Sequence, residues 1–143
     1  MNEHFTKLEN MMHSAPFLEF TGARVKISEG ESVITMPVEK KFFHAAGAMH
    51  GALYFLALDN AAFFAANSLV NDVFVLTVTF NVYLIRPVSK GVVTATGKVV
   101  NITRSQFIAE SIAYDSDNNE IARGSGIFVR SNMKLTEEMG YKL

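Results

Sequence analysis

The pattern of hydrophobic and polar positions changes its period near residue 70. Before that point, residues 50–68 form an almost unbroken apolar run, rich in Ala and Leu, without Gly or Pro after Gly51. Its length and composition predict a helix that is apolar on all sides and must be covered by the rest of the chain. After it, β-branched and aromatic residues lie between turn signals, which predicts strands. The predicted strands are residues 73–85, 92–104, 106–115 and 120–130.

The first fifty residues have a more mixed pattern. Residues 3–13 alternate charged and apolar side chains, which predicts a short amphipathic helix that Pro16 ends. Residues 17–28 have mixed β character, and residues 32–38 alternate as a strand. The polar residues 131–143 are expected to form a loose tail.

The order of these elements predicts an α+β fold. Four successive strands form an antiparallel meander with one face to bury, and the long apolar helix needs a cover. An antiparallel β-sheet wrapped around that central helix satisfies both requirements. No repeat or internal linker divides the chain, so we expect a single domain over residues 1–143, with its core at about 17–130.

Composition and charge narrow the possible functions. The 143 residues carry a net charge of −1, which argues against nucleic acid as a partner. Without Cys there is no thiolate nucleophile or thiolate metal site, and no His-rich or carboxylate-rich cluster predicts a metal. His50, Asp59, Asn60 and Asn67 interrupt the apolar run, so a membrane span is not expected. The N-terminus lacks the features of a signal peptide, and a cytoplasmic location is therefore expected.

Asp59 is the single charge within the apolar helix. Its helical neighbours Phe55, Leu56, Ala62 and Phe63 cannot neutralise it, so desolvation is expected to raise its pKa. A carboxylate in such surroundings is a candidate general base or nucleophile. The alternative is a structural carboxylate that faces solvent or accepts hydrogen bonds from a neighbouring loop.

His50 and Gly51 open the same helix, where unpaired N–H groups and a partial positive charge meet solvent. Gly51 lets a substrate approach the backbone, and a carbonyl there would be polarised as in an oxyanion hole. In the alternative interpretation, His50 only caps the helix. Gly51 and Asp59 lie eight residues apart, about 12 Å along the axis. One carbonyl can therefore contact both only if two antiparallel helices, from two subunits of a homodimer, contribute them.

The run "FHAAGAMHGALYFLALDNAAFFAAN", residues 43–67, resembles the hotdog-fold acyl-CoA thioesterases of the PaaI-like branch. Their pattern is Asn-x-x-Gly-x-x-His-Gly-Gly, followed by an Asp or Glu eight residues after the first Gly of His-Gly. Gly47, His50, Gly51 and Asp59 fit that spacing. "YLIRPV" (83–88) and "TATGKVV" (94–100) resemble the next strands of the family, and the likeness extends over about 17–130.

The resemblance implies catalytic roles for four residues. Asp59 would attack a thioester carbonyl or activate a water, and the Gly51 N–H would bind the carbonyl oxygen. His50 would orient that turn, and Thr77 would position the water or the carboxylate. The chain departs from the pattern at His44, which replaces the loop Asn, and at Ala52, which replaces the second Gly.

The resemblance also implies a substrate-binding surface near a dimer interface, with CoA as part of the substrate and no separate cofactor. The residues expected there are His44, Gly47, Met49, Arg86, Lys90 and Arg104. An apolar acyl or aryl tunnel is expected in the Phe- and Met-rich interior. The three cations would meet phosphates, or would be isolated surface charges.

The function implied is a metal-independent acyl-CoA thioesterase, assembled as a homodimer or a dimer of dimers. Two other functions stay open. A hotdog hydratase or dehydratase would use His44 or His50 with Asp59 as an acid–base pair. A non-catalytic domain would bind an acyl-CoA without releasing its thiol.

Overall fold

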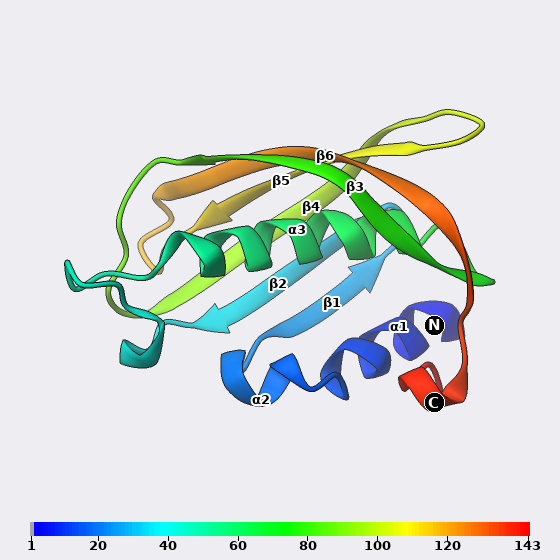
Figure 1. Ribbon diagram of the computed structural model, residues 1–143, viewed down its shortest axis with the longest axis horizontal. Coiled ribbons are helices and arrows are strands. Elements are labelled where there is room, and N and C mark those ends of the chain that lie inside the picture. The colour runs from blue at the N-terminus through cyan, green and yellow to red at the C-terminus, as the bar shows by residue number, and fades with distance from the viewer. Residues whose placement is uncertain (1) are drawn as a thin grey trace.

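The apolar run forms a helix around which one antiparallel sheet curves. In the computed structural model, which describes residues 2–143, this helix is α3 (Gly51–Asn67). Six strands form the sheet in the order β1-β2-β4-β5-β6-β3. Figure 1 shows the sheet wrapped over α3, with the N-terminal helices of residues 3–21 below β1. The predicted α+β fold is therefore confirmed.

The strands and the smaller helices have the following bounds. The strands are β1 (Arg24–Ser28), β2 (Glu31–Pro37), β3 (Val73–Leu84), β4 (Val92–Ile102), β5 (Phe107–Tyr114) and β6 (Glu120–Lys134). The other helices are α1 (Glu3–His13), α2 (Phe17–Thr21) and the 3-10 turns η1 (Lys40–Phe42) and η2 (Glu137–Met139). The predicted helix 3–13 and all four predicted C-terminal strands are present.

A row of small residues lets α3 approach the sheet closely. Ser32, Gly97, Ser111 and Gly124 are register partners across β2, β4, β5 and β6. A Cβ at Gly97 would collide with the Ala61 carbonyl oxygen, so only glycine fits there. The hydroxyls of Ser32 and Ser111 donate to helix carbonyl oxygens at 2.6 and 2.8 Å. These contacts fix the part of α3 that carries Asp59.

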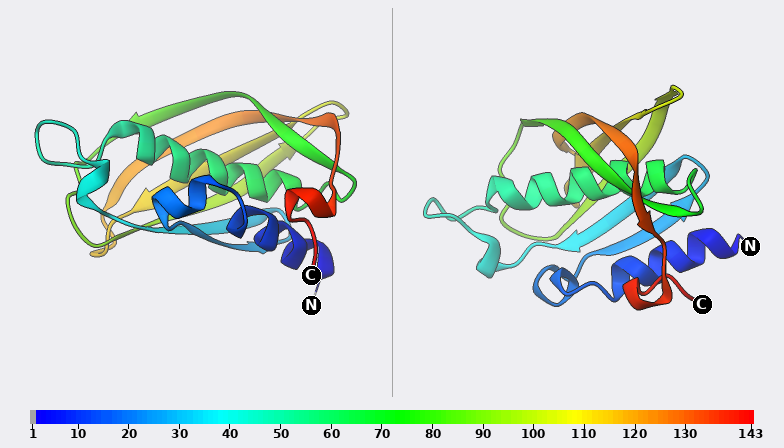
Figure 2. Two further views of the ribbon diagram at one scale, coloured as in Figure 1. Left: turned by 60° about the horizontal axis from the view of Figure 1, so that its bottom comes forward. Right: turned by 45° about the vertical axis from the view of Figure 1, so that its right-hand side comes forward.

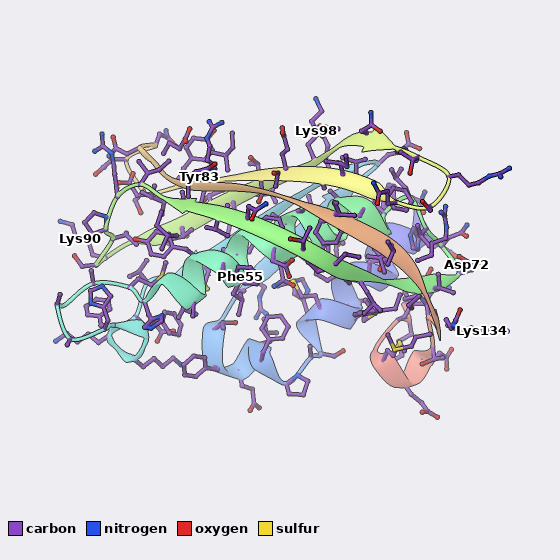
Figure 3. All side chains as sticks on the ribbon, turned by 45° about the horizontal axis from the view of Figure 1, so that its top comes forward. Phe55, Asp72, Tyr83, Lys90, Lys98 and Lys134 are labelled. Carbon is purple, nitrogen blue, oxygen red and sulfur yellow. The ribbon has the colours of Figure 1, made fainter. Side chains whose placement is uncertain are left out.

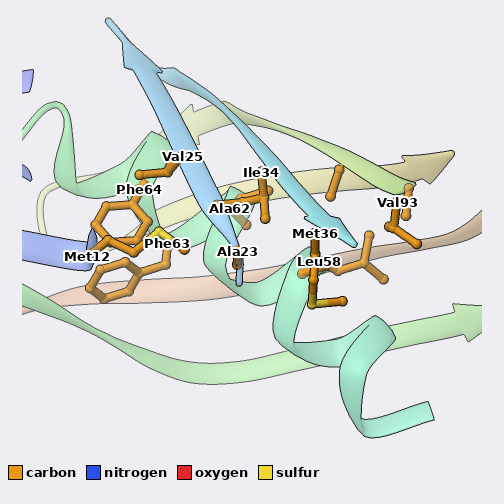
Figure 4. Packing of buried hydrophobic residues seen from close by; sticks show 14 of the residues in the cluster. Met12, Ala23, Val25, Ile34, Met36, Leu58, Ala62, Phe63, Phe64 and Val93 are labelled. Atoms are coloured by element: carbon orange, nitrogen blue, oxygen red, sulfur yellow. The ribbon is translucent and has the colours of Figure 1, made fainter. Parts of the chain in front are cut away.

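The main core lies between α3 and the inner face of the sheet. Figure 4 shows Leu58 beside Met36 and Val93, at the end of the core toward the start of α3. At the other end Phe63 and Phe64 pack edge to face, with ring centroids 4.9 Å apart, next to Met12 from α1. Helix α1 therefore extends the core beyond the sheet.

The two edges of the sheet differ in their protection. Along β1, the N–H groups of Val25 and Ile27 donate to His13 Nε2 at 3.0 Å and Glu9 Oε2 at 2.8 Å, both from α1. Among residues 2–143 no strand pairs with the outer side of β3. Helix α1 thus blocks one edge, and the other stays open for another strand.

A β-bulge in β3 changes which side chains face α3. Thr77 pairs with Phe128 and Thr79 with the adjacent Ile127, so Val78 has no partner on β6. Side chains three apart normally point to opposite faces of a sheet. Here both Thr77 and Phe80 reach α3, because the extra residue shifts the alternation between them.

Three features differ from the sequence prediction. The four C-terminal strands do not form a simple meander, because β3 lies at the sheet edge beside β6, and β4 pairs with β2 instead of β3. Residues 17–21 form α2 rather than the start of a strand, and Gly22 ends this helix at φ +67°. The expected loose tail continues β6 as far as Lys134 and then folds back over α1. Figure 2 shows the C-terminal turn against α1, with the two termini close together.

Candidate active site

Asp59 lies on the side of α3 that faces β3, the open edge strand of the sheet. The Thr77 hydroxyl donates to Asp59 Oδ1 at 2.9 Å, and both side chains are half-buried. The bulge at Val78 and the turn of α3 bring these two residues together although they are 18 positions apart. The hydrogen bond occupies Oδ1, and within residues 2–143 no hydrogen-bond partner is recorded for Oδ2.

Burial raises the pKa of the Asp59 carboxyl above its usual value, and the hydrogen bond from Thr77 lowers it in part. The expected direction of the shift is confirmed, and its main cause is the predicted desolvation. A carboxylate that is ionised but poorly solvated is more basic than one in water. Asp59 is therefore suited to accept a proton or to attack an electrophilic carbon.

A cavity of about 800 Å³ opens beside Asp59 and Thr77. Its wall comes from α3, β3, the α1–α2 region and the C-terminal turn η2. Most of the lining is apolar: Met11, Met12, Ala15, Pro16, Phe17, Phe63, Phe64, Phe74, Val75, Leu76 and Met139. The carboxylate thus borders a space that can hold an apolar group of ligand size.

The start of α3 presents a free backbone donor. His50 is the N-cap, and its Nδ1 accepts from the Ala52 N–H at 2.9 Å, while the Leu53 N–H donates to the His50 carbonyl. Among residues 2–143 no acceptor is recorded for the Gly51 N–H, which comes first in the helix. The capping role of His50 is therefore real, and it leaves the Gly51 N–H available to a carbonyl oxygen.

The loop before α3 is organised by His44. Its Nδ1 accepts from the Ala46 N–H at 3.0 Å, and Gly47 closes the turn at φ +82° by donating to the His44 carbonyl. The His44 and His50 rings lie 6.5 Å apart. Since each Nδ1 accepts a hydrogen bond, each neutral ring carries its proton on Nε2 and can donate from there.

A second, smaller cleft of about 280 Å³ lies at this end of α3. Four of the predicted residues, His44, Met49, Gly51 and Arg86, line it together. The Met49 side chain is almost fully buried and also belongs to the hydrophobic core. Within one chain, Gly51 and Asp59 therefore border different cavities, as their spacing along the helix predicts.

The three predicted phosphate-binding cations do not meet in one chain. Arg86 lines the smaller cleft. Hydrogen bonds from Asn119 are the main cause of the lowered pKa of the Asp115 carboxyl, and the charge of Arg86 makes a smaller contribution. Lys90 is exposed just before β4, at the end of the molecule where α3 begins (Figure 3). Arg104 follows β4 at its opposite end, roughly 35 Å away by strand length.

Sequence reasoning missed the part of the larger cavity made by the two ends of the chain. Met12, Phe17 and Met139 line this cavity from elements that were predicted as a helix, a strand and a tail. The available signal was Pro16 before and Gly22 after a five-residue stretch, which is the pattern of a short helix. None of the helices in residues 2–143 has the length and apolarity needed to cross a bilayer.

Comparison with known proteins agrees with this geometry. Residues 46–122 match the family model described as "Thioesterase superfamily". A Sulfurisphaera tokodaii protein named "Putative esterase" is 28% identical over 111 residues, which are 76% of this chain and 82% of that protein.

Two solved structures share the fold. The E. coli PaaI protein from the phenylacetic acid degradation operon superposes with a TM-score of 0.85 at 19% identity, over 94% of this chain and 97% of that one. A thioesterase family protein from Silicibacter pomeroyi has a TM-score of 0.80 at 26% identity, over 88% and 96%. The chain belongs to the thioesterase superfamily and has the hotdog fold of its PaaI-like members.

Proposed function

We propose that the protein is a homodimeric acyl-CoA thioesterase, which hydrolyses a thioester to a carboxylic acid and CoA at a site shared by two subunits. The observation that carries this proposal is the half-buried Asp59 carboxylate, held by Thr77 beside an apolar cavity. The free Gly51 N–H at the start of the same helix supplies the matching oxyanion donor.

The open edge of the sheet supports the dimer. On β3, Val78 and Leu84 are 60% and 57% exposed. Phe55, on the adjacent side of α3, is 42% exposed and is labelled in Figure 3. Pairing of two β3 edges about a two-fold axis would cover these side chains and set two α3 helices antiparallel. Phe55 lies halfway between Gly51 and Asp59, so an axis near it brings Gly51 of one subunit opposite Asp59 of the other.

In such a site the Gly51 N–H polarises the thioester carbonyl and stabilises the negative charge that develops on its oxygen. The Asp59 carboxylate of the partner subunit either attacks the carbonyl carbon or takes a proton from the attacking water. The C–S bond breaks, the CoA sulfur receives a proton, and the oxygen of water ends in the carboxylic acid. Both routes require Asp59 to be ionised, and the apolar acyl substituent then extends into the larger cavity.

Thiol release from a panel of acyl-CoAs tests this proposal, with wild-type protein and Asp59→Asn. We expect turnover by the wild type and a loss of at least ~100-fold in the variant, the usual effect of removing a positioned base.

The same substitution should increase the stability of the fold while it decreases activity. Because the folded-state pKa of Asp59 is raised, ionisation above that pKa destabilises the fold, and Asn removes this effect. The denaturation midpoint of Asp59→Asn at neutral pH should therefore rise.

Three other outcomes would contradict the proposal. Wild-type protein that binds acyl-CoA without releasing thiol would be a binding domain. Hydration of an enoyl-CoA without thiol release would identify a hydratase. Full thiol release by a folded, dimeric Asp59→Asn protein would show that the thioesterase reaction does not require Asp59.

A further inference from the structure

We propose that the C-terminal segment, residues 135–143, forms the end wall of the acyl-binding cavity and selects uncharged apolar acyl groups larger than acetyl. This inference rests on the proposed function, because it takes the cavity beside Asp59 as the acyl site. The segment lies against α1 in Figures 1 and 2, far along the chain from the helix that carries the carboxylate. Met139 is the residue of the segment that packs against the core and lines the cavity.

The position of Asp59 sets the direction of the acyl group. When a thioester carbonyl contacts Asp59, its apolar acyl substituent, and not the polar CoA, matches the mostly apolar cavity that the carboxylate borders. With about 800 Å³, this space is far larger than an acetyl group needs and lies within the range of sites for ligands of drug size. Only a larger acyl group would displace water from the apolar lining as far as Met139.

The segment is fastened to α1 by a set of side-chain contacts. The His4 ring joins the Tyr141 hydroxyl at 2.7 Å and the Asn67 carbonyl at 2.9 Å, which links both chain ends to the end of α3. The Asn10 amide donates to the Lys142 carbonyl at 2.7 Å. A terminal segment without such contacts is ordinarily mobile. These contacts hold it in place as a wall.

Gly140 lets the segment approach α1 without a gap. Its φ is +91°, which favours glycine, and a Cβ there would lie 3.2 Å from Met11 Cα and much closer to Ser14 Oγ. Any side chain at this position would push the segment away from α1. The position of the end wall therefore depends on glycine at this site.

The chemistry of the wall indicates which acyl groups fit. Met139 presents a flexible, polarisable thioether, which adapts to apolar groups of different shape. Glu137 and Glu138 also line the cavity, against one cation, Lys142. Together with Asp59, they give the cavity an excess of carboxylates, and an acyl group that ends in a carboxylate would be repelled.

The test uses non-hydrolysable CoA thioethers, in which a methylene separates the sulfur from the carbonyl, so that binding is measured without turnover. Titration calorimetry compares acetyl, hexanoyl, dodecanoyl, phenylacetyl and succinyl analogues. The variant is Met139→Trp, which fills the end of the cavity. The matched control is Met133→Trp, because Met133 is 44% exposed on β6 and does not line the cavity.

For the wild type we expect the hexanoyl, phenylacetyl or dodecanoyl analogue to bind more tightly than the acetyl and succinyl analogues. Met139→Trp should weaken the largest accepted analogue by at least about tenfold and leave acetyl unchanged, whereas Met133→Trp should behave as wild type. Gly140→Ala should displace the wall and reduce the difference between large and small analogues. An unchanged profile in both cavity variants, or no binding of any analogue, would overturn the inference.

This binding test, together with the thiol-release assay, separates the two proposals. Length-dependent binding that Met139→Trp alters, in a protein that releases no thiol, supports the end wall and refutes the thioesterase. Thiol release with a profile that Met139→Trp leaves unchanged supports the thioesterase and refutes the end wall.

Discussion

Asp59 experiences two opposing effects that together set its reactivity. Burial raises the pKa of its carboxyl, and the hydrogen bond from Thr77 lowers it. The first makes the carboxylate more basic, and the second keeps it ionised and fixes Oδ1. A carboxylate on the outer surface would not have its pKa raised by burial. A buried carboxylate without a hydrogen-bond donor would not have its pKa lowered again.

The pH profile of Thr77→Val tests this balance. Val has nearly the same shape as Thr but cannot donate, so the pKa of Asp59 should rise further when the hydrogen bond is lost. Because the ionised form is the reactive one, the acid limb of kcat/KM should move to higher pH in the variant. Thr77→Ser should restore it, and Thr79→Val, beyond the bulge on the exposed side, should not move it. A limb that stays in place or moves to lower pH would show that Thr77 does not act on this carboxylate.

Among the single elements, helix α1 explains why the two sheet edges differ in their ability to pair with another strand. Helix α1 supplies the acceptors His13 Nε2 and Glu9 Oε2 to the outward N–H groups of β1, which removes that edge from further pairing. His13 can accept this bond only while Nε2 is unprotonated. Burial and the Arg24 guanidinium lower the pKa of His13, whereas the Glu9 carboxylate raises it to a smaller extent.

This contact predicts a pH dependence of stability. A group whose folded-state pKa is lowered contributes stability that is complete above its unfolded pKa, about 6.5 for His. That contribution is lost as the pH falls from there through the folded pKa. Urea denaturation of wild type and His13→Gln at pH values from about 8 to 5 measures it, because the Gln amide oxygen accepts but does not titrate. The advantage of the wild type should shrink as the pH falls, and a constant difference would contradict the role of His13.

Much of the element order could be predicted from the sequence because its signals are long. The seventeen-residue α3 and the four C-terminal strands have a composition and period that only one kind of element fits. Helix α2 has five residues, too short for a helical period, and its identity depends on Gly22. The bulge at Val78 leaves no mark in composition, although it decides that Thr77 faces Asp59. The role of residues 135–143 depends on contacts with α1, which no local pattern reports.

At the scale of the whole molecule, the candidate site is divided. One chain holds Asp59 in the larger cavity and the Gly51 N–H in the smaller cleft at the start of α3. The uncovered side of α3 and the open edge of β3 lie next to each other, so one two-fold contact would cover both and complete two equivalent sites. The shared site is the central claim of the proposed function.

Subunit complementation tests that claim most directly. Gly51→Pro removes the N–H at the first helical position, where Pro is tolerated, and His50 already has the extended backbone that precedes Pro (φ −62°, ψ 142°). Gly51→Ala is the matched control, because it adds the same Cβ, 2.9 Å from the Leu84 Cδ1, but keeps the N–H. Gly51→Pro and Asp59→Asn should each be inactive as homodimers.

The decisive measurement is thiol release from an equal mixture of Gly51→Pro and Asp59→Asn subunits, after exchange. If the site is shared, each mixed dimer has one intact site, made of Gly51 from one variant and Asp59 from the other. With random pairing, the mixture should recover about one quarter of wild-type turnover per subunit. If Gly51 and Asp59 of the same subunit acted together, no mixed dimer would hold an intact site, and an inactive mixture would contradict the account.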